Sequence, residues 1–145
     1  MVARKQTFEA VRTITGQAGE DLTGTPYRLL KLNATGTGYV KSAAAGDYSV
    51  GVLAMDPNPT QGSTADSTGL AIVVALLEGI VLVEAGNSIT AGHLLESDSV
   101  GRVISAGANI GALAAGDYCI GTALEAAGAA GEIIAVRAQP FLHAA

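Results

Sequence analysis

Short runs of apolar, often β-branched residues alternate with polar, glycine-containing segments from residue 11 onward. Runs of this length between turn-forming residues are typical of the strands of a sandwich or barrel. Helix is expected to be scarce, because glycines weaken the helical pattern at residues 106–115 and 125–130. The expected fold is therefore mainly all-β, a compact β-barrel or sandwich with little helix. The pattern predicts strands at residues 11–15, 27–32, 38–42, 48–55, 70–77, 80–84, 93–97, 103–105, 118–125 and 132–139.

An internal match organises these strands. Residues 44–51 (AAGDYSVG) return 70 positions later as residues 114–121 (AAGDYCIG). We call the two AAGDY segments the first box (residues 44–48) and the second box (residues 114–118). The match extends to the flanking strands in the same order, which is the signature of a repeated module, and the length differences fall in loops. It pairs residues 27–31 with 92–96, residues 38–43 with 101–106, and residues 69–75 with 131–137.

The sequence thus predicts a single β-rich domain at residues 11–145, built from two related β modules. The two internal repeats are expected at about residues 11–86 and 87–142. Residues 1–10 are polar apart from Phe8 and a few small residues, and are predicted to form an extended N-terminal arm. Residues 56–69 contain two prolines and two glycines and are predicted to form a surface loop inserted in the first repeat.

Composition limits the possible partners. The chain is 49% hydrophobic but only 14% charged and 4% aromatic, so its core must be built from small and aliphatic side chains. The net charge of −5 is uneven: Arg4, Lys5 and Arg12 against Glu9 give residues 1–12 a charge of +2, and the remainder carries −7. An acidic body argues against nucleic-acid binding, which requires a basic surface.

Cysteine usage and hydropathy argue against disulfide-bonded, zinc-binding, secreted and membrane-spanning proteins. The single cysteine, Cys119, excludes an intramolecular disulfide and a Cys-based zinc site, and its counterpart Ser49 indicates a small, buried position. The first ten residues do not resemble a signal peptide, and the longest apolar run, residues 70–77, is far shorter than the ~20 residues that span a bilayer. We expect synthesis in the cytoplasm and no membrane association.

No motif predicts catalysis or a cofactor. Residues 96–101 begin like a calcium loop, but Val100 and Gly107 stand where ligands are required. His93 has Ser and Asp neighbours in sequence, whereas the members of a catalytic triad converge from different elements, and His143 has no partner nearby. Glycine-rich segments match neither a phosphate-binding loop nor a dinucleotide fingerprint. We expect no enzymatic activity, no cofactor and no metal.

The acidic residues of the two boxes, Asp47 and Asp117, are the most plausible functional acids, because each repeat keeps one. A Gly-Asp pair before a strand is also a common turn in which the carboxylate accepts hydrogen bonds from backbone N–H groups. The structural interpretation is favoured, because the two acids are separated into two repeats.

The order of these motifs resembles the small capsid decoration, or cement, proteins of tailed bacteriophages. The resemblance extends from about Thr7 to Arg137, and His93 departs from it where an acidic residue is common. The motifs that carry it are residues 27–32 (YRLLKL), 50–53 (VGVL), 78–86 (EGIVLVEAG), 89–95 (ITAGHLL), 101–103 (GRV) and 120–131 (IGTALEAAGAAG).

The resemblance implies a β-rich structural virion protein on the outer surface of the capsid. Such proteins bind the major capsid protein between capsomers, commonly as homotrimers, and stabilise the assembled shell. The +2/−7 charge division suggests that the arm carries the contacts, with Arg4, Lys5 and Arg12 on acidic coat loops and Phe8 as an apolar anchor.

Two other function classes were weighed. A β domain that binds a carbohydrate or a host-surface ligand through loops such as residues 56–69 predicts exposed aromatic rings, yet the chain has no Trp and only 2 Phe. A small hydrolase requires a convergent set of acid, base and nucleophile, and no such grouping of non-adjacent residues is evident.

Overall fold

Ten strands and one 3-10 turn, η2 (Ile110–Ala112), make up the labelled elements of the computed structural model, which describes residues 12–57 and 66–144. Each of the ten predicted strands is present, and the mainly all-β prediction is confirmed. The strands are β1 (Thr13–Gln17), β2 (Leu29–Leu32), β3 (Tyr39–Lys41), β4 (Gly51–Leu53), β5 (Ala71–Leu76), β6 (Gly79–Glu84), β7 (Leu94–Ser97), β8 (Val103–Gly107), β9 (Tyr118–Ala123) and β10 (Ile133–Leu142).

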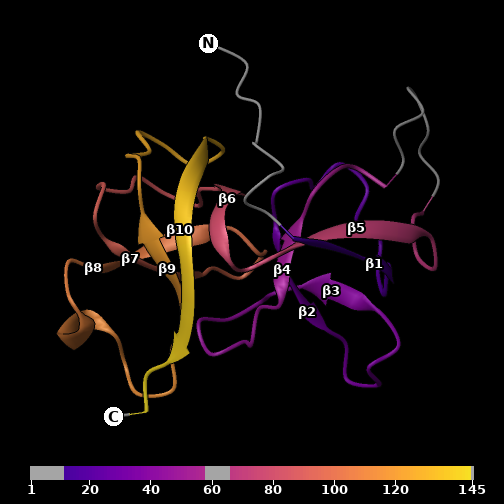
Figure 1. Cartoon of the computed structure of the whole chain (residues 1–145), viewed down its shortest axis with the longest axis horizontal. Helices are drawn as coiled ribbons and strands as arrows, with labels where there is room; N and C mark the ends of the chain where they lie inside the picture. The colour runs from indigo at the N-terminus through magenta and orange to yellow at the C-terminus, as the bar shows by residue number, and fades with distance from the viewer. Residues whose placement is uncertain (1–11, 58–65, 145) are drawn as a thin grey trace.

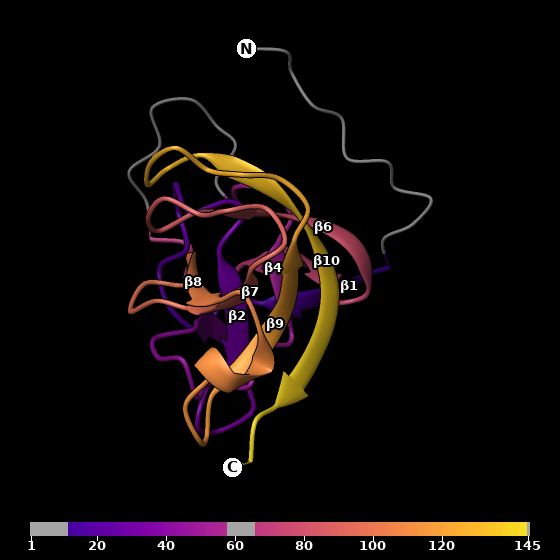
Figure 2. The same ribbon diagram turned by 90° about the vertical axis from the view of Figure 1, so that its left-hand side faces the viewer.

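The strands form two five-stranded antiparallel sheets that make a compact sandwich. Their orders are β1-β5-β4-β2-β3 and β6-β10-β9-β7-β8, so each strand of the second sheet takes the place of the strand five earlier. In Figure 1 the first sheet lies on the right and the second on the left. Figure 2 shows the long, curved β10 beside β9 at the surface of the molecule.

Of the two predicted architectures, the sandwich is present and the closed barrel is not. Each sheet keeps two edge strands, whose backbones are joined by one isolated parallel bridge. The bridges join Ala18 to Tyr39 in the first sheet and Ala85 to Val103 in the second. The bridges bring the two edges of each sheet together at one equivalent point, and no ladder of the described residues closes either sheet.

Cross-strand pairing identifies equivalent residues in the two sheets. Leu30 pairs with Gly51 in the first sheet, and Leu95 pairs with Gly121 in the second. A Cβ at either glycine would collide with the carbonyl oxygen of the neighbouring strand, at Ala75 or Arg137. Both boxes therefore lead into strands that approach their neighbour closely enough to require glycine.

The sequence match is one residue out of register at β3 and β8. Lys31 pairs with Val40, and its equivalent Glu96 pairs with Ile104, whereas the sequence match set Val40 against Val103. A shift of one residue exchanges the two faces of a strand. Pairing with β2 and β7 fixes the register. A strand as short as Tyr-Val-Lys, with a single aliphatic residue, does not contain that information.

The first strands of the two sheets, β1 and β6, correspond to each other, although the sequence match did not include them. Residues 17–19 (QAG) and 84–86 (EAG) occupy the same positions, since Ala18 N donates to Leu70 O and Ala85 N donates to Glu132 O. β6 pairs with β10 and so belongs to the second sheet. The sheets thus divide the chain just before Gly79, earlier than the repeat boundary predicted at residues 86 and 87.

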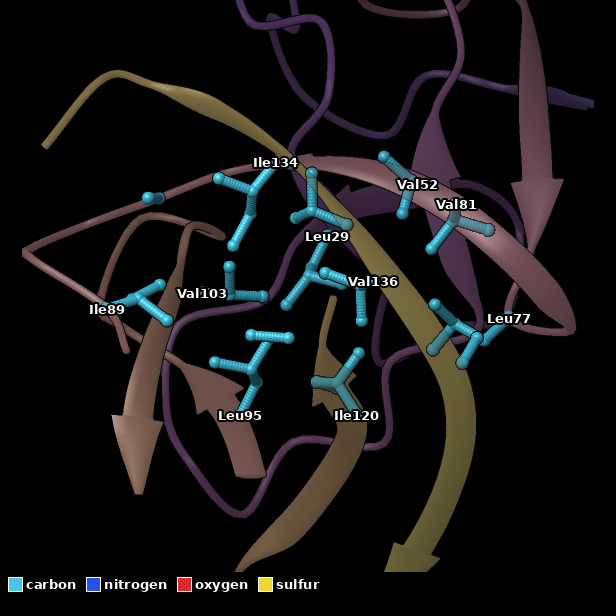
Figure 3. Close-up of a cluster of buried hydrophobic side chains, with 14 of the residues drawn as sticks. Leu29, Val52, Leu77, Val81, Ile89, Leu95, Val103, Ile120, Ile134 and Val136 are labelled. Atoms are coloured by element: carbon cyan, nitrogen blue, oxygen red, sulfur yellow. The ribbon is translucent and has the colours of Figure 1, made fainter. Parts of the chain in front are cut away.

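Two cores fill the sandwich. Leu30 and Leu53 point into a small core within the first sheet, together with Leu22, Ile72 and Val74. Their neighbours Leu29 and Val52 point to the opposite face, because side chains alternate along a strand. Figure 3 shows Leu29 and Val52 among side chains of the second sheet, such as Val81, Ile134 and Val136. The outer face of the first sheet therefore completes the core of the second.

Backbone and ionic contacts also join the two sheets where the first packs on the core of the second, and we call this region the junction. Leu29 N donates to Gly101 O at 2.7 Å, and Glu84 N donates to Tyr27 O at 2.9 Å. The guanidinium of Arg28 lies 2.9 Å from Glu84 Oε2, and both side chains are mostly buried. The same guanidinium donates to Val100 O at 3.0 Å. The two sheets are thus joined by a continuous set of apolar, backbone and charged contacts.

Tyr27 is the one described non-glycine residue with a positive φ, of 66°. Its equivalent is Gly92, with a φ of 90°. Tyr27 N donates to Leu53 O, and Gly92 N donates to Ala123 O, which is the corresponding carbonyl. The first sheet keeps a strained backbone because the Tyr27 side chain packs on the shared core.

Candidate interaction surface

The two boxes meet each other across the two sheets, and we call this contact the box seam. Tyr118 N donates to Ala45 O at 2.7 Å. The rings of Tyr48 and Tyr118 pack edge to face with centroids 5.2 Å apart. Gly46 lies so near the backbone of Gly116 that an added Cβ would be 3.1 Å from its carbonyl oxygen. The repeated sequence thus marks one joint in the folded chain and not two separate turns.

Each box is a turn stabilised by its aspartate. Asp47 N donates to Ala44 O, and Asp117 N donates to Ala114 O, both at 3.1 Å. The carboxylate of Asp47 accepts hydrogen bonds from two backbone N–H groups, those of Ala43 and Ala44. The carboxylate of Asp117 accepts one from Ala114 N at 2.7 Å. Both acids therefore have the turn-forming contacts that the structural interpretation requires.

Two apolar side chains are exposed at the box seam. Tyr48 is 62% exposed and is the one exposed aromatic side chain among the described residues. Leu142, opposite Tyr118 in the pairing of β9 with β10, is also exposed. Burial and the neighbouring Tyr48 raise the pKa of Tyr118. Singly exposed apolar side chains are common on protein surfaces, and a single exposed ring is a weak platform for sugar stacking.

The charges next to the two boxes differ. Beside the first box, Lys31 Nζ lies 2.7 Å from Asp47 Oδ2. Burial alone raises the pKa of Asp47, but the bonds and charge of Lys31 and the backbone N–H groups outweigh it, so the pKa is lowered. Beside the second box the equivalent of Lys31 is Glu96. Burial, and then the hydrogen bond and charge of Asp117, raise the pKa of Glu96 to about 7.

The predicted capsid-contact residues fall largely outside the described part of the chain. Arg4, Lys5 and Phe8 lie outside it, as does the whole of the predicted arm, residues 1–10. Arg12 is described, and its side chain is 83% exposed. Its Nε lies 3.6 Å from Glu78 Oε1, and its carbonyl oxygen accepts a bond from Leu76 N. The chain thus enters β1 with an exposed cation at the edge of the first sheet.

Only the two ends of the predicted loop at residues 56–69 are described, since residues 58–65 lie outside the description. Asp56 Oδ2 accepts a hydrogen bond from Gly24 N at 3.1 Å. Ser67 is fully buried, and its Oγ accepts from Leu22 N at 2.7 Å and donates to Asp21. Hydrogen bonds from Thr23 and Ser67 lower the pKa of Asp21 to about 2. Both ends of the segment between β4 and β5 are therefore fixed to the first sheet.

The described side chains that could in principle take part in catalysis or metal binding make structural contacts instead. His93 Nδ1 lies 2.7 Å from Ser105 Oγ, with no aspartate beside it among the contacts of the described residues. Asp98 accepts bonds from Val100 N, Arg102 N and the Arg102 side chain, which close the turn after β7. Cys119 is buried, and burial raises the pKa of its thiol. Within residues 12–57 and 66–144, no three His, Cys, Asp or Glu side chains are grouped to hold a metal ion.

Comparison with known protein families decides the class. The family model described as phage cement protein matches residues 62–138, which is more than half of the chain and includes β5 to β9 and most of β10. The chain belongs to the phage cement protein family. The resemblance drawn from the sequence motifs is thereby confirmed, and this cement protein is a structural protein of a phage virion.

A solved structure supports the fold of the cement protein. The crystal structure of the head fiber gp8.5 N base in bacteriophage phi29 matches with a TM-score of 0.60 at 18% identity. The match covers 89% of this chain and 94% of that chain, so the likeness extends over both sheets. No curated protein matches the chain. Among the described residues no helix is long and apolar enough to cross a membrane.

Sequence reasoning identified the boxes but missed what they do together. The contact of Tyr48 with Tyr118 and the contrast between Lys31 and Glu96 became visible only with the pairing of the strands. The signal available in the sequence was the aligned change of charge at residues 31 and 96 next to a repeated aspartate.

Proposed function

We propose that this cement protein binds the outer surface of a phage capsid between capsomers and stabilises the assembled shell. Its partner is the major capsid protein, it acts as a homotrimer, and it has no enzymatic role. The observation that carries the proposal is the family match over residues 62–138, which covers nearly all of the second sheet. The two sheets serve as two copies of one module, as their identical strand order suggests.

The proposed mechanism is thermodynamic linkage. A protein that binds the assembled lattice and not loose coat subunits shifts the equilibrium toward the lattice by mass action. A trimer that contacts neighbouring capsomers at once adds avidity, because the second and third contacts form at a high effective concentration. No catalytic group is needed for this role.

The basic residues at the start of the chain supply the contact to the coat. Arg4, Lys5 and Arg12 give residues 1–12 a charge of +2, whereas the remainder carries −7, so attraction to acidic coat loops is confined to this end. Phe8 supplies an apolar anchor. The 83% exposure of Arg12 is in keeping with this role.

The test mixes the purified protein with undecorated mature capsids and measures co-sedimentation and the temperature at which capsids release their contents. We expect saturable binding at micromolar concentration and a higher release temperature. A capsid that neither binds the protein nor gains heat resistance contradicts the proposal.

Two variants test the contact residues separately. Deletion of residues 2–10 should abolish capsid binding while the circular dichroism spectrum and the unfolding midpoint stay unchanged. Arg12→Glu should weaken binding, most strongly at low salt, because the attraction is electrostatic. Arg137→Glu is the matched control, since Arg137 is an exposed cation on β10 of the second sheet. Equal losses of capsid binding in the two arginine variants would contradict the assignment of the contact to this end of the chain.

A further inference from the structure

Glu96 and Asp117 occupy the positions that Lys31 and Asp47 occupy in the first sheet. Lys31 follows Leu30 and Glu96 follows Leu95, and these leucines pair with the equivalent glycines of β4 and β9. The aspartates stand at the same place in the two boxes. An ion pair beside the first box is therefore replaced by two carboxyl groups beside the second.

The local contacts of this pair lack a donor. Glu96 Oε2 is buried and has no hydrogen-bond partner among the described residues. Asp117 already accepts a bond from Ala114 N, and no described cation forms an ion pair with either acid. Two ionised carboxylates are both acceptors and repel each other. A proton on Glu96 makes it a donor to Asp117 and satisfies the buried oxygen.

We propose that Glu96 and Asp117 share one proton and act as a pH-sensitive latch on the box seam, closed when the proton is present and loosened when it leaves. The loss is a simple deprotonation to solvent and requires no other reactant. It leaves two negative charges beside the second box. The proposal concerns the free protein and does not depend on the capsid-binding function.

The latch has a direct connection to the seam. Gly116 N donates to His143 O at 2.7 Å, and His143 N donates to Asp117 O at 2.8 Å. Tyr118 N donates across the seam to Ala45 O. Asp117 thus lies in the turn that holds both the end of β10 and the first box, so repulsion from Glu96 acts on both contacts.

The titratable groups around the pair are few. β9 contributes Cys119, whose thiol is close enough to Glu96 for their charges to interact, and Tyr118, which packs on Tyr48. β8 places Ile104 opposite Glu96 and contributes no charge there. The end of β10 brings His143 through its backbone. Across the seam the first box adds Asp47 and its partner Lys31. The comparison of the wild type with Glu96→Gln therefore separates the carboxyl pair from these other groups, His143 included.

The direction of the pH dependence follows from linkage. The pKa of Glu96 is about 7 in the folded protein and 4.5 for the free side chain, so the folded state binds more protons between these values. The stabilisation is fully present below pH 4.5 and is lost as the pH rises through about 7. The latch thus weakens the seam on the alkaline side.

The experiment measures hydrogen exchange of the Tyr118 amide by NMR, as a protection factor corrected for intrinsic rates, from pH 5 to pH 9. In the wild type we expect protection to fall by about tenfold or more, mainly between pH 5 and pH 7, and to level off above pH 7. In Glu96→Gln, whose amide is a permanent donor, the change should be less than about twofold. Denaturant unfolding at pH 5 and pH 8 should show the same difference.

Two further variants keep the test decisive. Glu96→Lys recreates the ion pair of the first sheet and should also remove the alkaline loss, which provides a readout if Glu96→Gln folds poorly. Glu78→Gln, which removes an exposed carboxylate near Arg12, should keep the wild-type pH profile. A wild-type profile that persists in both Glu96 variants, or a flat wild-type profile, overturns the proposal.

Discussion

The two sheets share one strand order yet have different outer faces. Leu29 and Val52 of the first sheet are fully buried, because they fill the core of the second. Their equivalents in the second sheet, Leu94 and Thr122, are only half-buried. The same arrangement of strands therefore has two roles: the first sheet covers the core of the second, and the second sheet is covered by the first. The difference shows that the second sheet depends on the first for its core.

The largest effect should come from truncating this shared core. We expect Leu29→Ala to lower the free energy of unfolding by about 2–5 kcal/mol, because it leaves a cavity at a fully buried position. Leu94→Ala, at the equivalent position, should cost less than about 2 kcal/mol, since Leu94 is already partly exposed. Denaturant unfolding monitored by circular dichroism measures both. Equal costs would show that the second sheet does not depend on Leu29.

A smaller effect should follow from breaking the ion pair at the junction. Arg28→Met removes the contacts with Glu84 and Val100 and leaves a mostly buried carboxylate without its cation. We expect a cost of about 1–3 kcal/mol in the free energy of unfolding, the range for losing the partner of a buried charged hydrogen bond. Arg12→Met is the control, because its pair with Glu78 is solvent-exposed and should contribute at most ~1 kcal/mol. Similar values for the two arginines would argue against a charged junction.

The smallest effect should come from the ion pair beside the first box. Lys31→Met should cost about 0.2–1 kcal/mol at pH 7, as for other partly exposed pairs. Because Lys31 helps to lower the pKa of Asp47, the stabilisation is present above the ordinary value of 3.8 and is lost as the pH falls below it. Thermal unfolding at pH 7 and pH 3 tests this, with Lys41→Met on the neighbouring strand as control. A cost that is the same at both pH values contradicts the assignment.

The sequence was sufficient to predict the strands and most of the correspondence between the strands of the two sheets. Glycine-bounded apolar runs predicted all ten strands, and the repeated boxes pointed to the correct partners, since Gly51 and Gly121 sit at equivalent close approaches. The register of β3 and β8 was not accessible, because β3 is only three residues long and fits two alignments. The pairing of β1 with β5 was also hidden, since it joins segments more than 50 residues apart without a charge or motif in common.

The site was less accessible than the fold. Asp47 and Asp117 were correctly expected to have turn contacts, but nothing in a linear pattern indicates that two turns will touch each other. The raised pKa of Glu96 depends on its burial beside Asp117, and burial is a property of the packed sheets. Tyr27 is similar: its positive φ is understood only from its contact with the shared core, since the equivalent residue is the expected glycine.

The shared core has a consequence for the order in which the protein is made. The first sheet is complete only when β5 has left the ribosome, since β1 pairs with β5. At that moment Leu29 and Val52 still face water, because the strands that cover them, β6 and β10, come later in the chain. A nascent chain whose first sheet has formed exposes this apolar face to water until β10 is released, and exposed apolar surface of this kind favours aggregation.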